Sequence, residues 1–125
     1  MKIIDIHEDK RGYIKSVEGL LDNQQEFTFM EIKKGRARGG CYHTIPENFV
    51  VIKGQIKYIY GQIDGPYEEK ILNKGNSGTI NPKIAHAFVG LEDSIVSEWG
   101  VTTSEKIADV KDPKLRKIVE DYNKL

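Results

Sequence analysis

The sequence has a single cysteine, Cys41, among 125 residues, so no disulfide can form within the chain. It also lacks net charge, because 19 basic residues balance 19 acidic ones and the two kinds are interleaved. Proteins that bind nucleic acid or an anionic membrane surface concentrate basic residues on one face or segment. We therefore expect neither nucleic acid nor membrane as a partner.

Long apolar runs are missing as well, and none approaches the ~20 residues that a membrane-spanning helix needs. Residues 1–10 lack the apolar stretch of a secretion signal, so we expect a cytoplasmic protein. No phosphate-loop or dinucleotide-binding glycine pattern occurs, so no nucleotide cofactor is expected. The length suits a single domain over residues 1–125.

Short segments with the pattern of β-strands recur along the chain. Residues 27–32 (FTFMEI) alternate apolar and polar side chains, as a half-buried strand does. Further strands are expected at residues 2–6, 13–17, 41–43, 49–52, 56–60, 67–72, 79–80, 87–89 and 95–101. Strands spaced by roughly 8–12 residues with turn residues between them predict an all-β sandwich or barrel of roughly eight to ten strands.

The C-terminal segment has the pattern of a helix instead. Asp112 followed by Pro113 is typical of a helix N-cap with proline at the first helical position. Apolar side chains then recur with helical spacing at Leu115, Ile118, Val119 and Tyr122. A short helix over about 112–124 is expected to pack on the barrel or on a partner subunit.

Reactive side chains gather in the middle of the chain. Cys41 and His43 are two residues apart, so on a strand both point to the same side. A turn at residues 44–46 would return Glu47 beside them, and His86 could add a fourth donor. Thiolate, imidazole and carboxylate groups all bind divalent transition metals. Cys41 could instead be a small buried apolar residue.

The spacing of these residues resembles the first motif of the cupin superfamily, G-x5-H-x-H-x3,4-E-x6-G. Residues 35–54 follow it with Gly35, His43, Glu47 and Gly54 in place and Cys41 at the first histidine.

Residues 75–90 resemble the second cupin motif, G-x5-P-x-G-x2-H-x3-N, with Gly75 and His86 in register. Asn81 stands at the proline position, Lys83 at the second glycine and Gly90 at the final asparagine.

The resemblance implies a jelly-roll β-barrel that forms a homodimer and acts on a small-molecule substrate. It also implies a divalent metal, which could be Zn, Fe, Ni or Mn, held by Cys41, His43, Glu47 and His86.

Two shorter stretches resemble a narrower group of cupins. Residues 38–43 (RGGCYH) and 9–13 (DKRGY) are similar to segments of dTDP-4-keto-sugar 3,5-epimerases and 3,4-ketoisomerases of polysaccharide biosynthesis. The resemblance implies proton transfer next to the carbonyl of a nucleotide-linked keto-deoxysugar. Arg38 and Arg36 could then bind a diphosphate through bidentate hydrogen bonds.

The same resemblance implies that two histidines and two tyrosines could take part in the proton transfer. His43 or His86 could remove the proton, because an imidazole has a pKa near neutrality. Tyr58 or Tyr60 could donate or return it.

Two other functions fit the same residues. One is a metal-dependent dioxygenase or lyase that uses Cys41, His43, Glu47 and His86. The other is a module that binds a sugar or small ligand without turnover. A barrel fold alone does not choose among the three.

Overall fold

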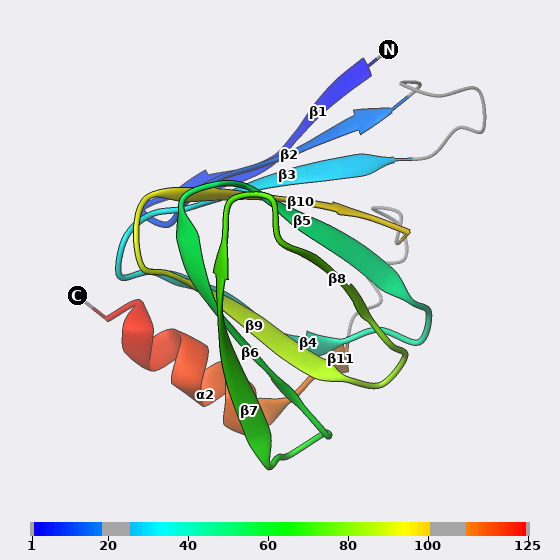
Figure 1. The fold of residues 1–125 in the computed structure, drawn as a ribbon, viewed down its shortest axis with the longest axis vertical. Coiled ribbons are helices and arrows are strands. Elements are labelled where there is room, and N and C mark those ends of the chain that lie inside the picture. Colours follow the sequence, from blue (N-terminus) through cyan, green and yellow to red (C-terminus); the bar gives the residue numbers. More distant parts are fainter. Residues whose placement is uncertain (1, 19–25, 101–109, 125) are drawn as a thin grey trace.

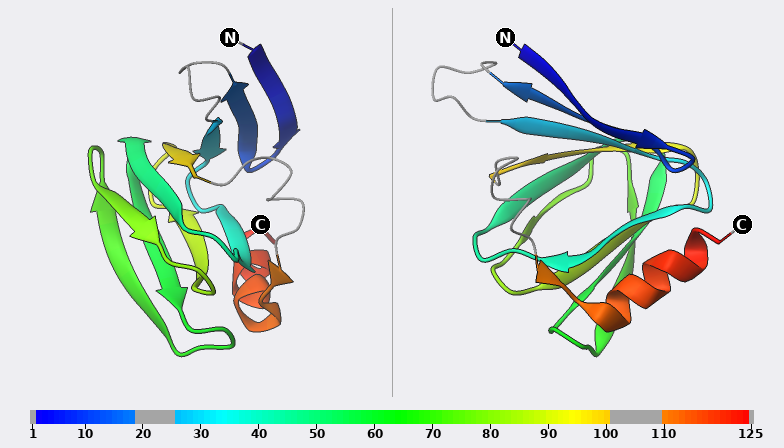
Figure 2. Two further views of the ribbon diagram at one scale, coloured as in Figure 1. Left: turned by 90° about the vertical axis from the view of Figure 1, so that its right-hand side faces the viewer. Right: turned by 180° about the vertical axis from the view of Figure 1, so that it is seen from behind.

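A computed structural model describes residues 2–18, 26–100 and 110–124. It contains two antiparallel sheets that face each other, with a helix outside the second sheet (Figures 1 and 2). The first sheet has the order β1-β2-β3-β10-β5-β8 and the second has the order β11-β4-β9-β6-β7.

The strands of the first sheet are β1 (Lys2–Asp9), β2 (Gly12–Glu18), β3 (Phe27–Ile32), β10 (Ser94–Trp99), β5 (Glu47–Lys53) and β8 (Ser77–Ile80). The strands of the second are β11 (Val110–Lys111), β4 (Ala37–Tyr42), β9 (Ala85–Gly90), β6 (Gln55–Gly61) and β7 (Tyr67–Asn73).

The all-β prediction is confirmed. The described residues form eleven strands, and β3 has the bounds that its alternation predicts. β11 has only two residues and was not expected from the sequence. The last predicted strand ends at Trp99, and Val101 lies outside the described residues.

The core lies between the sheets, and it is formed by inward side chains of the central strands. Buried positions alternate along the whole of β3, and along β5 from Glu47 to Val51. The buried apolar cluster consists of Met30, Ile32, Phe49, Val51, Ile56, Tyr58, Ile80, Phe88 and Val96. Burying a side chain of this kind stabilises the fold by about 1.5–3 kcal/mol, so this cluster holds the two sheets together.

The short C-terminal helix is present as α2 (Pro113–Tyr122). The Asp112 carboxylate caps it by accepting hydrogen bonds from the backbone N–H groups of Lys114 and Leu115. Leu115 and Val119 are buried against the outer face of the second sheet. The sheet side of that contact consists of Ala37, Ile59, Ala85, Ala87 and Val89.

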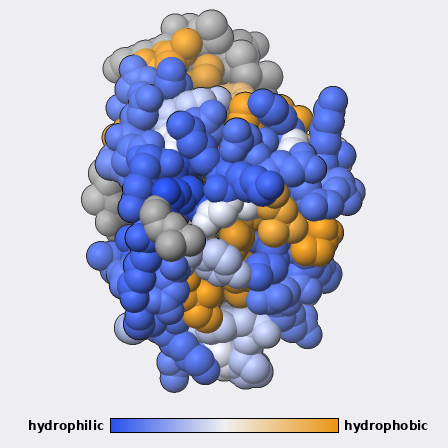
Figure 3. Space-filling view, turned by 90° about the vertical axis from the view of Figure 1, so that its left-hand side faces the viewer, coloured by the Kyte–Doolittle hydropathy of each residue, from blue (hydrophilic) through white to orange (hydrophobic). Residues whose placement is uncertain are grey.

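The outer surface is mixed in character. The face in Figure 3 is mostly hydrophilic, with smaller hydrophobic areas between the polar residues. Among the exposed apolar side chains, Ile3 and Ile6 belong to β1 and Ile71 to β7, which are edge strands of their sheets. No helix in the described part of the chain is long and apolar enough to cross a membrane.

Candidate metal and anion site

A cavity of about 430 Å³ opens between the sheets. The residues that the cupin motifs single out as metal donors line it, namely Cys41, His43, Glu47 and His86. Four basic side chains line it as well, Arg11, Arg38, Lys111 and Arg116. Potential metal donors and cationic groups therefore share one cavity.

An irregularity in β4 turns Cys41 into this cavity. β4 pairs with β9 so that Arg38 lies opposite Phe88 and Gly39 opposite Ala87. The register then shifts by one residue, which leaves Gly40 without a counterpart and sets Cys41 opposite His86. Such a bulge reverses the alternation of side chains. Without it, Cys41 would face the same side as Gly39, away from the core.

Only glycine suits the two residues of the bulge. Gly39 and Gly40 have φ angles of 109° and 90°, a region that other residues rarely adopt. A Cβ atom on Gly39 would lie 2.7 Å from the carbonyl oxygen of His86. A Cβ atom on Gly40 would lie 2.9 Å from the Cα atom of Arg116 in α2.

The turn after β4 returns the chain as the sequence predicts. His43 follows β4, and Glu47 opens β5 with its side chain fully buried. The Glu47 Oε1 atom lies 3.3 Å from Nε2 of His43 and 3.6 Å from Nε2 of His86. One carboxylate oxygen therefore contacts both imidazoles.

The orientation of the His86 ring is set by the backbone. Its Nδ1 atom lies 3.2 Å from the carbonyl oxygen of Ile84. A carbonyl oxygen only accepts hydrogen bonds, so Nδ1 carries the proton. In the neutral ring the lone pair of His86 is then on Nε2, the atom that lies 3.6 Å from Glu47. Metal-binding histidines are commonly oriented by a backbone contact of this kind.

The structure adds one site residue that sequence reasoning missed, Glu98. It lies on β10, is only 7% exposed and lines the cavity. A carboxylate oxygen of Glu98 lies within 4.8 Å of donor atoms of Glu47 and His86. The sequence did contain a signal, because Glu98 has the same alternation phase as Val96, a core position of β10. A glutamate at an inward strand position requires a partner.

The donor set fits a divalent metal. Donor atoms of Cys41, His43 and His86 lie within 4.8 Å of one another, as do those of Glu47, His86 and Glu98. Ligand atoms bound about 2.0–2.3 Å from one ion are at most about 4.6 Å apart. Small side-chain shifts would bring either set into contact with an ion.

Arg38 provides a buried cation in the same cavity. Its side chain is 2% exposed, and its Nε donates a hydrogen bond to the carbonyl oxygen of Glu31. Neither terminal nitrogen has a hydrogen-bond partner among the described residues, although Nη2 lies 4.0 Å from the carboxylate of Asp9. Burial and the nearby Arg11 lower the pKa of Arg38 to about 10, so it remains charged at neutral pH.

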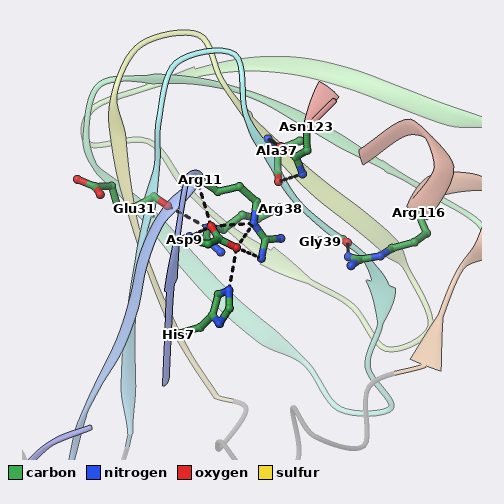
Figure 4. Close-up of polar contacts among 9 residues, drawn as sticks. All are labelled: His7, Asp9, Arg11, Glu31, Ala37, Arg38, Gly39, Arg116 and Asn123. Atoms are coloured by element: carbon green, nitrogen blue, oxygen red, sulfur yellow. Dashed lines mark hydrogen bonds and ion pairs between the residues drawn. The ribbon is translucent and has the colours of Figure 1, made fainter. Parts of the chain in front are cut away.

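Asp9 organises this basic region, as Figure 4 shows. The Arg11 guanidinium donates hydrogen bonds to both Asp9 oxygens, and His7 lies 2.7 Å from one of them. The hydrogen bonds from Arg11 hold the pKa of Asp9 well below its usual range. Asp9 therefore stays ionised and fixes Arg11 beside Arg38.

Three predicted site residues lie elsewhere. Arg36 does not line the cavity, and its guanidinium donates to the carbonyl oxygen of Asn123. Tyr58 belongs to the core cluster, and the ring of the partly buried Tyr60 stacks on it. Neither tyrosine lines the cavity. Burial raises the pKa of Tyr58. The roles assigned to these three residues gain no support from their positions.

Comparisons by sequence find no matching family model and no matching curated protein. Solved structures do match. A structure of CapF, a capsular polysaccharide assembling protein from Staphylococcus aureus, has 16% identity and a TM-score of 0.68, over 84% of this chain and 31% of that chain. A CapF structure with the inhibitor 3-isopropenyl-tropolone has 19% identity and a TM-score of 0.67, over 78% of this chain and 30% of that one.

Oxalate decarboxylase OxdC from Bacillus subtilis is similar as well. It has 15% identity and a TM-score of 0.69, over 87% of this chain and 32% of that chain. The chain thus matches about a third of the length of each of these solved chains. At such low identity the likeness shows the fold alone, and the fold is that of the cupins, as the two sequence motifs predict.

Proposed function

We propose that the chain is a metal-dependent enzyme that transfers a proton next to the carbonyl of an anionic sugar. The observation that carries this proposal is the shared cavity, in which the donors around His86 lie together with the buried guanidinium of Arg38. A nucleotide-linked keto-deoxysugar of polysaccharide biosynthesis is the substrate class that residues 38–43 favour. The fold that the chain shares with a capsular polysaccharide assembling protein is consistent with that class.

Each group in the cavity has a task in such a reaction. A divalent ion, when bound, would polarise the carbonyl and stabilise the negative charge that develops on its oxygen. Arg38 binds the anionic group of the substrate through its two terminal nitrogens. Arg11, fixed by Asp9, adds positive charge at the same cavity.

His43 is the proposed base. Its Nε2 atom lies 3.3 Å from the Glu47 carboxylate, which stabilises the imidazolium that forms when His43 takes the proton from carbon. The proton on the imidazole exchanges with solvent, and a solvent-derived proton is then delivered to the sugar on another face or at the neighbouring carbon. His86 serves as a ligand, because its Nδ1 is committed to Ile84.

Solvent deuterium exchange tests this function. The metal-loaded protein is incubated with a dTDP-4-keto-6-deoxyhexose in D₂O, and deuterium at the ring carbons is followed by NMR. We expect exchange that His43→Asn abolishes, while Arg36→Met leaves it unchanged. Absence of proton exchange in every keto-sugar tested, with Zn²⁺, Fe²⁺, Ni²⁺ and Mn²⁺ loaded in turn, would overturn the proposal.

A lyase acting on a small carboxylate is the second candidate. Arg38 favours it, because two neighbouring N–H donors match the two oxygens of one carboxylate. Oxalate decarboxylase shares the fold. Release of CO₂ from small dicarboxylates or keto acids by the metal-loaded protein would identify this activity. Binding of either substrate class without turnover would instead indicate a ligand-binding module.

We also propose that the chain acts as a cytoplasmic homodimer. β1 is an edge strand of the first sheet, and Ile3 on it is 61% exposed. Pairing with a second copy would cover this apolar edge. Light scattering coupled to gel filtration measures the mass in solution, and Ile3→Lys is expected to shift it to that of one chain.

A further inference from the structure

Two sets of metal donors overlap in the cavity, and they differ in chemical character. The first consists of Cys41, His43 and His86, which offer one sulfur and two nitrogens. The second consists of Glu47, His86 and Glu98, which offer two carboxylates and one nitrogen. His86 belongs to both sets, and we refer to them as the sulfur set and the carboxylate set.

The shared histidine makes the two sets mutually exclusive. A neutral imidazole has one lone pair, and in His86 it is on Nε2 because Nδ1 donates to Ile84. His86 can therefore bind one ion at a time. An ion in the sulfur set deprives the carboxylate set of its only nitrogen, and the reverse holds as well.

The two sets prefer different ions. Thiolate and imidazole ligands favour Zn²⁺ and Co²⁺, whereas carboxylates suit a harder ion such as Mn²⁺. The carboxylate set requires Glu98, because without it only two donors, Glu47 and His86, remain. Glu98 also lies outside both motif segments, on the middle of the first sheet.

We propose that Glu98 is a metal ligand, and that the cavity binds one divalent ion either in the sulfur set or in the carboxylate set, depending on the ion. This inference deepens the proposed function, on which its catalytic consequence rests. An ion in the carboxylate set does not coordinate His43, which can then act as the base, whereas an ion in the sulfur set binds His43. The choice of ion then decides whether the base is available.

Metal binding to the whole, metal-stripped chain tests the proposal without any substrate. Mn²⁺ binding is followed by electron paramagnetic resonance. Co²⁺ binding is followed by absorption, where a thiolate ligand produces a sulfur-to-cobalt charge-transfer band. We expect that band in the wild-type chain, one ion per chain for each metal, and displacement of Mn²⁺ by Zn²⁺.

Two variants separate the sets. Glu98→Gln should weaken Mn²⁺ binding by about 100-fold or more, beyond the 10–100-fold typical of a residue that only orients a ligand. It should leave the cobalt band and Zn²⁺ affinity unchanged. Cys41→Ser should abolish the band and weaken Zn²⁺ binding while sparing Mn²⁺. Glu31→Gln on the adjacent strand β3 is the matched control, because Glu31 does not line the cavity.

Circular dichroism and urea unfolding verify that each variant is folded. If Glu98→Gln fails to fold, Glu98→Asp keeps the charge but moves the carboxylate back, and it should still weaken Mn²⁺ selectively. Unchanged Mn²⁺ affinity in a folded Glu98 variant would overturn the proposal, and so would simultaneous binding of Mn²⁺ and Zn²⁺. Correct metal selectivity without proton exchange would reject the proposed function while leaving the two-set inference intact.

Discussion

Cys41 lies directly opposite His86 across the β4–β9 pair, although strict alternation from Arg38 would turn its thiol away from the cavity. The extra residue at Gly40 makes the difference. A thiol and an imidazole that are distant in sequence become neighbours because two adjacent glycines accept backbone angles that other residues avoid. The sulfur set therefore depends on the bulge as much as on the cysteine.

The first prediction concerns that bulge. Gly40→Ala should lower the free energy of unfolding by more than the about 1–2 kcal/mol that a left-handed φ costs an ordinary residue. The added Cβ would also press on the backbone of Arg116 in α2. We further expect the sulfur-to-cobalt charge-transfer band to weaken as Cys41 is displaced. Urea unfolding and cobalt absorption measure the two effects.

Gly35→Ala is the matched control. Gly35 has a φ angle of 81°, close to that of Gly40, but a Cβ there would meet no atom within 4 Å. It should show the backbone cost alone and keep the cobalt band. Equal losses of stability in the two variants would contradict the assigned role of the helix contact.

A second prediction concerns the buried guanidinium of Arg38. Arg38→Met should weaken binding of pyrophosphate by about 10–100-fold, since a hydrogen bond to a charged group contributes about 1.5–3 kcal/mol. Without an anion, the variant should be no less stable than the wild type, because a buried cation with unsatisfied donors is replaced by an apolar side chain. Calorimetric titration and thermal unfolding measure the two quantities.

Arg36→Met is the appropriate comparison, because Arg36 lies outside the cavity. It should leave pyrophosphate affinity unchanged. The assignment fails if the two substitutions weaken binding equally.

The third prediction is a dependence of stability on pH. The Asp9 pKa is lowered, chiefly by hydrogen bonds from Arg11. Its contribution to stability is therefore present above the unfolded-state pKa of about 3.9 and is lost as the pH falls through the lower pKa of the folded state. Asp9→Asn should cost about 1 kcal/mol at pH 7, given that Asp9 is partly exposed to solvent.

Urea unfolding at pH 7 and at pH 3 tests this prediction. The difference between Asp9→Asn and the wild type should shrink at the lower pH. Asp121→Asn is the control, because Asp121 pairs with lysines on the exposed surface of α2. A difference for Asp9→Asn that does not change with pH would rule out ionisation of Asp9 as its cause.

A fourth prediction concerns the start of α2. The buried Asp112 carboxylate accepts hydrogen bonds from the helix N-terminus, from the backbone N–H of Asp64 and from the hydroxyl of Tyr67. Asp112→Ala should lower the free energy of unfolding by about 2–4 kcal/mol, the sum of a lost cap and of donors left unsatisfied. Asp112→Asn, which keeps an acceptor, should lose less. Chemical unfolding gives both values, and equal losses would exclude the capping role.

Local signals were enough to predict much of the fold. The alternation in residues 27–32 and the Asp112-Pro113 pair indicated β3 and α2 because each reflects a periodicity or a cap within a few residues. The turn that brings Glu47 to His43 was also predictable, since a proline marks it.

Other features depend on partners that are distant in sequence. Arg36 and Arg38 look alike in the sequence, yet only Arg38 lines the cavity, because the strand begins at Ala37 and Arg38 pairs with Phe88. Glu98 lies on β10 outside both motif segments, and the position of its carboxylate beside Glu47 and His86 depends on pairing between strands that are distant in sequence. Tyr58 and Tyr60 had the right residue type for proton transfer, but their rings stack in an aromatic cluster that only the folded sheets create.

The end of the chain also shields one border of the second sheet. The Asn123 side chain accepts from the backbone N–H of Ala37 and donates to its carbonyl oxygen, and Arg116 donates to the carbonyl oxygen of Gly39. The strand β11 pairs only with Cys41 and Tyr42 of β4. The contacts from the C-terminal segment satisfy the backbone groups of Ala37 and Gly39 that β11 does not reach, as a neighbouring strand would do. Residues 37–39 therefore do not offer unpaired backbone groups to a strand of another molecule, which disfavours aggregation through this edge of the cavity wall.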